Sequence, residues 1–402
     1  MSMLSVSKAA DSSAKWAAVA IGFSVPISVA LDNALLLAIL VLWLVGANFR
    51  EKYGIIRENP VALASLALIG LLAIGMLYGS ASIHEAVNTL GKYIDLLFIP
   101  IFITLFSDSK TRRHALAAFM TAMMLTLFLS YMLKMGILHQ NSILRGFAGN
   151  PYVFKLYITQ NFFMAFASMV LATWFLHEKD PRKRLLWGIL TLLALINVLF
   201  MVYGRTGYIV LALLVPYLFI RKLGKKGLLI GIVATLVFGS MAYFGSKVFH
   251  ERVSLATDEF THWQPEKAAD TTNSIGQRME FYSNTLKIIE KHPIFGVGTG
   301  GFEQAYAAQV ANTKMLQTHN PHNEFLLIMV QTGLPGLVLL LLLFFKQWRE
   351  ASSLSEKETY LARALVLAMI SGCLFNSFLL DHAEGLFFAF MTGVLFSGKT
   401  KT

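Results

Sequence analysis

Residues 318–345 read THNPHNEFLLIMVQTGLPGLVLLLLLFF and join a polar segment of the chain to a long apolar one. The apolar part, residues 326–345, is long enough to cross a bilayer as a helix. Before it stands His322, and before His322 lies a long polar segment, residues 245–322. A histidine at the mouth of a membrane helix, beside a water-facing segment, indicates chemistry at a membrane surface.

The composition is that of a membrane protein. The 402 residues are 56% hydrophobic and only 14% charged, and the mean hydropathy is +0.60. A soluble protein carries about 25% charged residues. The net charge of +11 does not indicate nucleic-acid binding, because the basic residues stand in short loops between apolar runs, where they set membrane orientation. The fold class predicted is an all-α polytopic membrane protein.

We predict about twelve transmembrane helices from the apolar runs. They cover residues 16–30, 32–47, 61–79, 86–106, 114–134, 154–176, 185–203, 206–220, 227–244, 323–345, 360–377 and 381–397. The chain is thereby divided into a first part, 1–244, the loop 245–322, and a last part, 323–402. Within the loop we expect an amphipathic helix from Ser274 to about His292, then a flexible glycine-rich turn at 296–301, and a second helix at 302–310.

The basic loops predict an orientation. Loops 48–60, 107–113, 177–184, 221–226 and 346–359 are rich in Lys and Arg and alternate with loops that hold few bases. Cytoplasmic loops carry the excess of such residues. We therefore expect both termini in the cytoplasm and the loops 135–153 and 245–322 on the outside.

A few cations break this pattern. Arg205 in the turn 204–207 and Arg278 in the external loop stand on the side where bases are scarce, as do Arg145 and Lys155, while Lys92 lies inside a predicted span. Each has an ordinary alternative: an interface anchor, a solvated helix face or a snorkelling lysine. Together they predict a site for a lipid-linked phosphate or diphosphate, because arginine holds phosphate oxygens with two parallel hydrogen bonds and neutralises a departing diphosphate.

His322 is the expected base. With Asn320 as helix N-cap and Pro321 as the first helical residue, His322 would lie in the first turn, where the helix dipole lowers the imidazole pKa. A neutral imidazole can accept a proton from a hydroxyl. His319 is a second, less favoured candidate. Asp381 begins the last predicted span and could orient an Arg or a His, or simply favour a helix N-terminus.

Three other patterns carry no function. Gly296, Gly298 and Gly301 fit a dinucleotide motif, but no strand precedes them. His319 and His322 lack the further ligands of a zinc site. The sequence has no Walker A motif. We therefore expect no metal and no cofactor, and no ATP as the energy source.

These motifs, in this order, resemble the bacterial O-antigen ligase family, within the group that also holds O-antigen polymerases and protein O-oligosaccharyltransferases. The resemblance is concentrated at 204–333, in GRTG (204–207), RMEFYSNTLKIIEKHPIFGVGTGGF (278–302) and HNEFLLIMVQTG (322–333). It implies a metal-independent, GT-C-like enzyme of the bacterial inner membrane, with its active site in the periplasm.

By motif position, the resemblance implies that Arg205 and Arg278 hold a diphosphate and that His322 activates the acceptor hydroxyl. From the residues themselves, we expect Lys92, Arg145 or Lys155 to assist the two arginines. The donor would be a glycan on undecaprenyl diphosphate, and the acceptor a sugar hydroxyl of lipid A-core. After the last predicted span, 381–397, we expect no larger external region of the kind usual in protein transferases, and this expectation favours a ligase. A polymerase, a protein transferase and a non-catalytic transporter of polyprenyl lipids stay open as alternatives.

Overall fold

A computed structural model describes residues 3–261, 263 and 274–398, and its described part is helical throughout, with one isolated β-bridge between Phe147 and Asn150. Within these described residues, eight helical segments are long and apolar enough to span a membrane, or nine if the bent pair α2 and α3 forms one span, and two shorter apolar helices accompany them. The polytopic α-helical class is confirmed, whereas the predicted count of twelve spans is not.

Most helices follow the predicted apolar runs, but the first begins at Met3 and not at residue 16, and the predicted span 86–106 is divided into two helices. Those before the polar segment are α1 (Met3–Ser24), α2 (Val29–Val45), α3 (Phe49–Glu58), α4 (Pro60–Gly75), α5 (Ile83–Lys92), α6 (Asp95–Leu105), α7 (Ser109–Lys134), α8 (Tyr157–His177), α9 (Pro181–Ile196), the π-helix η1 (Asn197–Met201), α10 (Arg205–Leu223) and α11 (Lys225–Gly245). The others are α12 (Lys247–Thr261), α13 (Ser274–Lys291), α14 (Phe302–Val310), α15 (Glu324–Glu350), the 3-10 helix η2 (Ala351–Ser353), α16 (Glu356–Phe375) and α17 (His382–Phe396).

The core is an aromatic cluster between α8, α6 and α17. Phe162, Phe163 and Phe387 are fully buried, and the rings of Phe163 and Phe387 lie 4.8 Å apart. Helices α9 and α11 instead expose large apolar side chains such as Leu192 and Leu236. In a membrane protein such faces contact lipid tails, so α8 and α17 form the centre of the bundle and α9 and α11 its rim.

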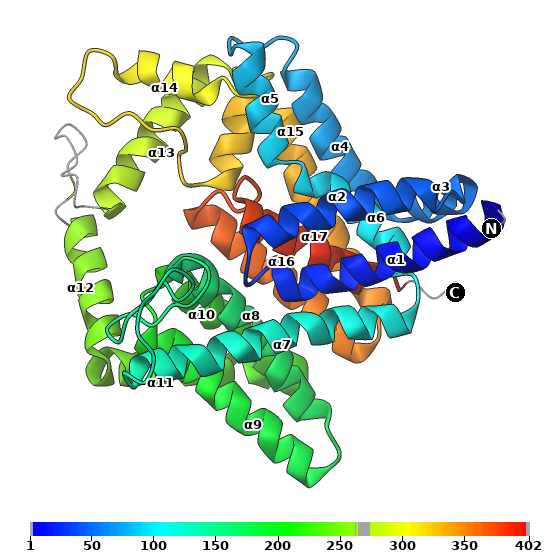
Figure 1. Cartoon of the computed structure of the whole chain (residues 1–402). Coiled ribbons are helices and arrows are strands. Elements are labelled where there is room, and N and C mark those ends of the chain that lie inside the picture. The colour runs from blue at the N-terminus through cyan, green and yellow to red at the C-terminus, as the bar shows by residue number, and fades with distance from the viewer. Residues whose placement is uncertain (1–2, 262, 264–273, 399–402) are drawn as a thin grey trace.

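Contacts between distant loops define two ends of the bundle. At one end the basic loops meet: Arg112 pairs with Glu358 at 3.7 Å, and the guanidinium of Arg221 lies 5.0 Å from the ring of Tyr360. At the other end Tyr78 donates to the carbonyl of Phe295 at 2.7 Å. Helices α12, α13 and α14 lie on the side of the molecule away from both termini (Figure 1). The sorting of loops by charge thus corresponds to a sorting in space.

The glycine-rich turn is packed rather than flexible, which corrects the expectation. The backbone N–H groups of Val297 and Gly298 donate to carbonyls of Val330 and Gln331 in α15, at 2.8 and 2.9 Å. Gly298 has φ 85°, and a Cβ there would collide with the backbone of Gly79. The turn fits beside α15 where that helix is kinked at Gly333, with φ 66°. The motif therefore anchors the polar segment to the membrane bundle.

Candidate functional site

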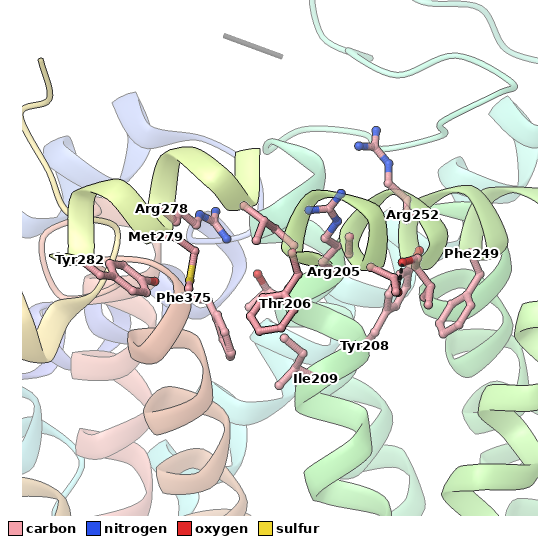
Figure 2. A pocket seen from close by; sticks show the side chains of 15 residues that line it. Arg205, Thr206, Tyr208, Ile209, Phe249, Arg252, Arg278, Met279, Tyr282 and Phe375 are labelled. Atoms are coloured by element: carbon pink, nitrogen blue, oxygen red, sulfur yellow. Dashed lines mark hydrogen bonds between the residues drawn. The ribbon is translucent and has the colours of Figure 1, made fainter. Parts of the chain in front are cut away.

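A cavity of about 560 Å³ opens where α10, α12 and α13 meet. We call it the arginine cavity because Arg205, Arg252 and Arg278 line it, one from each of these helices. The rest of its lining is largely apolar and includes Ile209, Phe249, Val253, Phe260 and Phe375. Figure 2 shows the three guanidinium groups along one edge and Ile209, Phe249 and Phe375 on the opposite side. The cavity therefore has a cationic edge and an apolar side that faces it.

Arg205 is placed by glycines. A Cβ at Gly204 or at Gly207 would come closer than van der Waals contact to Asn161 of α8, and the Asn161 amide donates to the Gly204 carbonyl at 2.9 Å. Only glycine permits this approach. The GRTG turn therefore packs directly on α8 and starts α10 with Arg205 at the cavity.

The guanidinium of Arg205 is only partly paired. Its Nη1 donates to Ser274 Oγ at 3.2 Å and lies 3.6 Å from Glu259 Oε2. Its Nε and Nη2 are buried and find no hydrogen-bond partner among the described residues. Buried donors without partners are costly. Charge-assisted hydrogen bonds to an anion would offset that cost.

Arg278 links the cavity to His322. Its Nη2 donates to Asn376 Oδ1 at 3.3 Å. Burial lowers the pKa of Arg278 below its ordinary value, and the charge of Arg205 lowers it further, although Tyr282 acts in the opposite direction. An arginine stays protonated in spite of this. Two like charges at one cavity indicate a site for a multiply charged anion.

Arg252 was not predicted from the sequence, and neither was its helix. Its guanidinium lies 4.9 Å from the ring of Tyr203. A signal was available, since Phe249, Val253, Ala256 and Phe260 recur at helical spacing and all line the cavity. The polar residues between them concealed the pattern.

The sequence predicts His322 in the first turn of the helix, and this prediction is wrong, because His322 lies before the helix begins. The N-cap is Asn323, whose side chain accepts from Leu326 N at 3.0 Å, and α15 begins at Glu324. His322 has φ 56°, in the left-handed region. Burial, and then the charge of Arg278, lowers its pKa to about 4. The predicted neutral imidazole is supported, but its cause is desolvation and a neighbouring cation.

The backbone of His322 is fixed from both sides. Its N–H donates to Asn320 Oδ1 at 2.8 Å, and its carbonyl accepts from the hydroxyl of Tyr282 at 3.1 Å. The imidazole lies 6.2 Å from the ring of Phe281, centroid to centroid. Because Tyr282 lines the arginine cavity, His322 lies next to the cavity.

The five remaining candidates do not line the arginine cavity. Lys155 is buried and pairs with Asp32 at 3.4 Å. Lys92 and Arg145 are exposed, at the end of α5 and in the loop before α8. The structure therefore brings together Arg205, Arg278 and His322 and leaves these three lysine and arginine residues outside.

His319 and Asp381 also lie outside the cavity. His319 is on the surface and pairs with Glu303 at 2.7 Å. Asp381 occupies the N-cap position of α17 without a capping hydrogen bond from its side chain. Burial raises the pKa of Asp381 to about 6, opposed by the charge of Lys92. Across the described ranges, no three His, Cys, Asp or Glu side chains converge as metal ligands would.

Comparisons of the sequence with known proteins found the following similarities. A Haemophilus influenzae protein described as uncharacterized is 24% identical over 264 residues, which cover 62% of this chain and 62% of that protein. Residues 190–341, which include Arg205, Arg278 and His322, match the profile of a family described as O-antigen ligase. The resemblance inferred from the motifs is thereby confirmed over residues 190–341.

Proposed function

We propose that the protein transfers a glycan from undecaprenyl diphosphate to a sugar hydroxyl of lipid A-core, at the periplasmic face of the bacterial inner membrane. The observation that carries this proposal is the arginine cavity, which places three guanidinium groups at one edge of a space whose other lining is largely apolar. A ligand that fits it has an anionic head and a hydrocarbon body. A polyprenyl diphosphate has both.

The arginines suit the diphosphate head. Arg205 retains two buried donors without a described partner, and among the described residues the guanidinium of Arg278 donates to a neutral amide, that of Asn376. Guanidinium groups bind phosphate oxygens through two parallel, charge-assisted hydrogen bonds. Such preorganised cations stabilise charge on the leaving group as it develops. Arg252 extends the same cationic edge.

The reaction is a single displacement at the anomeric carbon. The acceptor hydroxyl oxygen forms the new bond to that carbon while the bond between the carbon and the diphosphate oxygen breaks, and the electron pair leaves with undecaprenyl diphosphate. His322 takes the hydroxyl proton, because its imidazole is neutral at pH values above about 4. Attack opposite the leaving group inverts the anomeric configuration. Neither a metal nor ATP takes part in this scheme.

The other candidate residues fit the acceptor better than the diphosphate. Lys92 and Arg145 are exposed cations outside the cavity, and lipid A-core is itself anionic. His319 and Asp381 would make weaker contacts to the acceptor. Lys155 is paired with Asp32 and is therefore the least suited of these residues to bind either substrate.

The orientation follows from the two ends of the bundle. The basic loops that meet at one end are assigned to the cytoplasm, so the arginine cavity at the other end opens toward the periplasm. Both termini are then cytoplasmic. Surrounding membrane lipids complete the environment of the apolar helices.

A transfer assay tests the proposal. Purified protein receives undecaprenyl-diphosphate glycan and lipid A-core, without ATP and with a metal chelator present, and lipopolysaccharide is followed as a shifted band. We expect transfer by the wild type and loss of transfer by His322→Ala. Longer glycans on the carrier, without transfer to lipid A-core, would identify a polymerase instead. Absence of both products would overturn the proposal and redirect attention to protein acceptors or to lipid transport.

A further inference from the structure

Two adjacent residues connect the cationic half of the site to the histidine half. Asn376 and Ser377 lie in the connection between α16 and α17 and are 6% and 0% exposed. Neither lines the arginine cavity. We propose that Asn376 and Ser377 are positioning residues: Asn376 sets the place of Arg278, and Ser377 sets the place of His322. This inference rests on the proposed function.

Asn376 joins two helices of the cavity. Its Oδ1 accepts from Arg278 Nη2 at 3.3 Å, and its Nδ2 donates to Thr206 Oγ1 at 3.2 Å. Arg278 belongs to α13, and Thr206 is the neighbour of Arg205 in α10. One amide thus fixes the separation of the two arginines that the function assigns to the diphosphate. The amide is neutral, so this bond does not neutralise the positive charge of Arg278.

Ser377 acts on His322 through Asn320. Its hydroxyl donates to Asn320 Oδ1 at 2.7 Å, and the same oxygen accepts from the backbone N–H of His322 at 2.8 Å. His322 has φ 56°, a conformation that residues other than glycine keep only where their surroundings hold it. Ser377 is part of that support. The direction of the imidazole therefore depends on a residue outside the His-Asn motif.

The connection that carries both residues is itself anchored to the start of α15. The Asn323 amide donates to the Leu374 carbonyl at 3.0 Å, and Glu324 Oε2 accepts from Leu379 N at 2.8 Å. The two bonds lie on either side of Asn376 and Ser377 in sequence. The connection is thus a fixed platform, and small changes in it displace catalytic groups by distances that matter for rate.

Kinetics on adjacent variants test the proposal. Ser377→Ala should lower kcat about tenfold to a hundredfold and leave the donor KM nearly unchanged, because the arginines are not disturbed. Asn376→Ala should mainly raise the donor KM. Ser371→Ala is the matched control, since Ser371 is buried in α16 and donates only within its own helix, to Ala368. If Ser377→Ala and Asn376→Ala changed kcat and the donor KM in the same way, and by no more than the control Ser371→Ala does, the assignment would be overturned.

A spectroscopic titration separates this inference from the proposed function. In protein labelled at histidine, the signal lost in His322→Gln identifies the His322 ring, which should titrate near pH 4 in the wild type and in Ser371→Ala. In Ser377→Ala the ring should leave its buried place and titrate closer to the ordinary value of about 6.5. If wild-type protein transfers no glycan but this shift occurs, the function fails and the positioning stands. An unchanged titration in Ser377→Ala overturns the positioning role of Ser377.

Discussion

Two groups of buried charge lie at the same end of the bundle and differ in their pairing. Around α2, α8 and α17, Lys155 lies 3.4 Å from Asp32, and their side chains are 8% and 0% exposed. In the arginine cavity, Arg205 keeps two buried donors without a described partner, and Arg278 meets a neutral amide. Within the described residues, the charges of the first group are paired with each other, and those of the second group are only partly paired.

The difference separates structural charges from charges that await a ligand. A buried ion pair that satisfies itself holds helices together, and removal of one partner leaves a costly isolated charge. A buried arginine with free donors costs stability on its own, and it persists where function needs it. We therefore expect changes in the first group to alter stability and changes in the second to alter activity.

The largest effect is expected in the cavity. Arg278→Ala should reduce transfer by about a hundredfold to a thousandfold, because it removes a preorganised cation from the departing diphosphate. The thermal unfolding of the purified protein should change little. A loss of transfer that only parallels a loss of folded protein would place Arg278 in the structural group.

The reverse is expected for the paired group. Asp32→Ala should lower stability by about 3–5 kcal/mol, since it leaves Lys155 buried and unpaired. Transfer per folded molecule should stay near the wild-type rate. Asp11→Ala is the control, because the partly exposed pair of Asp11 with Lys15 is closer to the surface kind of ion pair, which contributes about 0–1 kcal/mol. Equal effects of the two substitutions in thermal unfolding would contradict the distinction.

A conservative change sharpens the comparison. Arg205→Lys keeps the charge but loses the planar fork that holds two phosphate oxygens. We expect the affinity for a lipid diphosphate to fall about tenfold, the effect of roughly 1.4 kcal/mol, and the affinity for a lipid monophosphate to fall less. Binding measured with both lipids decides the point. The same loss for both would show that only charge matters.

The pH dependence follows from His322. Its folded-state pKa of about 4 lies below its ordinary value, so the unfolded chain binds more protons between these values. Transfer should be nearly constant at neutral pH and fall as pH drops through about 4. The contribution of His322 to stability is present above its ordinary pKa and is lost as pH falls toward 4. His322→Gln should remove this part of the stability profile; an unchanged profile would argue against a buried neutral imidazole.

The smallest effect is expected at His319. This residue is exposed and paired at the surface with Glu303, so His319→Ala should change transfer by less than about twofold and stability by less than about 0.5 kcal/mol. The transfer activity of His319→Ala is measured alongside that of His322→Ala, so that two histidines three positions apart are compared directly. A large loss of transfer in His319→Ala would exchange their roles.

The sequence predicted the parts of this molecule that depend on local patterns. Apolar runs located the helices, and the predicted helix at 302–310 appears as α14 with the same bounds. The sequence motifs indicated Arg205, Arg278 and His322 as site residues, and the fold places all three at or beside one cavity. Their catalytic roles stay predictions.

What the sequence did not predict depends on contacts between distant residues. The bonds of Asn376 reach across 98 and 170 positions, and no local pattern marks them. Lys155 stood out as an unpaired cation because its partner Asp32 is 123 positions away. His322 was assigned to the first helical turn because Asn320 is a good N-cap, yet Asn323 is equally good and caps the helix in the structure.

The most direct test of the account is stabilisation by the diphosphate lipid itself. Thermal unfolding is measured with undecaprenyl diphosphate, for the wild type, for Asp32→Ala, and for the double variant Arg205→Ala, Arg278→Ala. A ligand at a hundred times its Kd adds about 2.7 kcal/mol to stability. We predict that gain for the wild type and, from a lower baseline, for Asp32→Ala, and almost none for the double arginine variant. Equal stabilisation of all three proteins would contradict the claim that the underpaired arginines bind the donor.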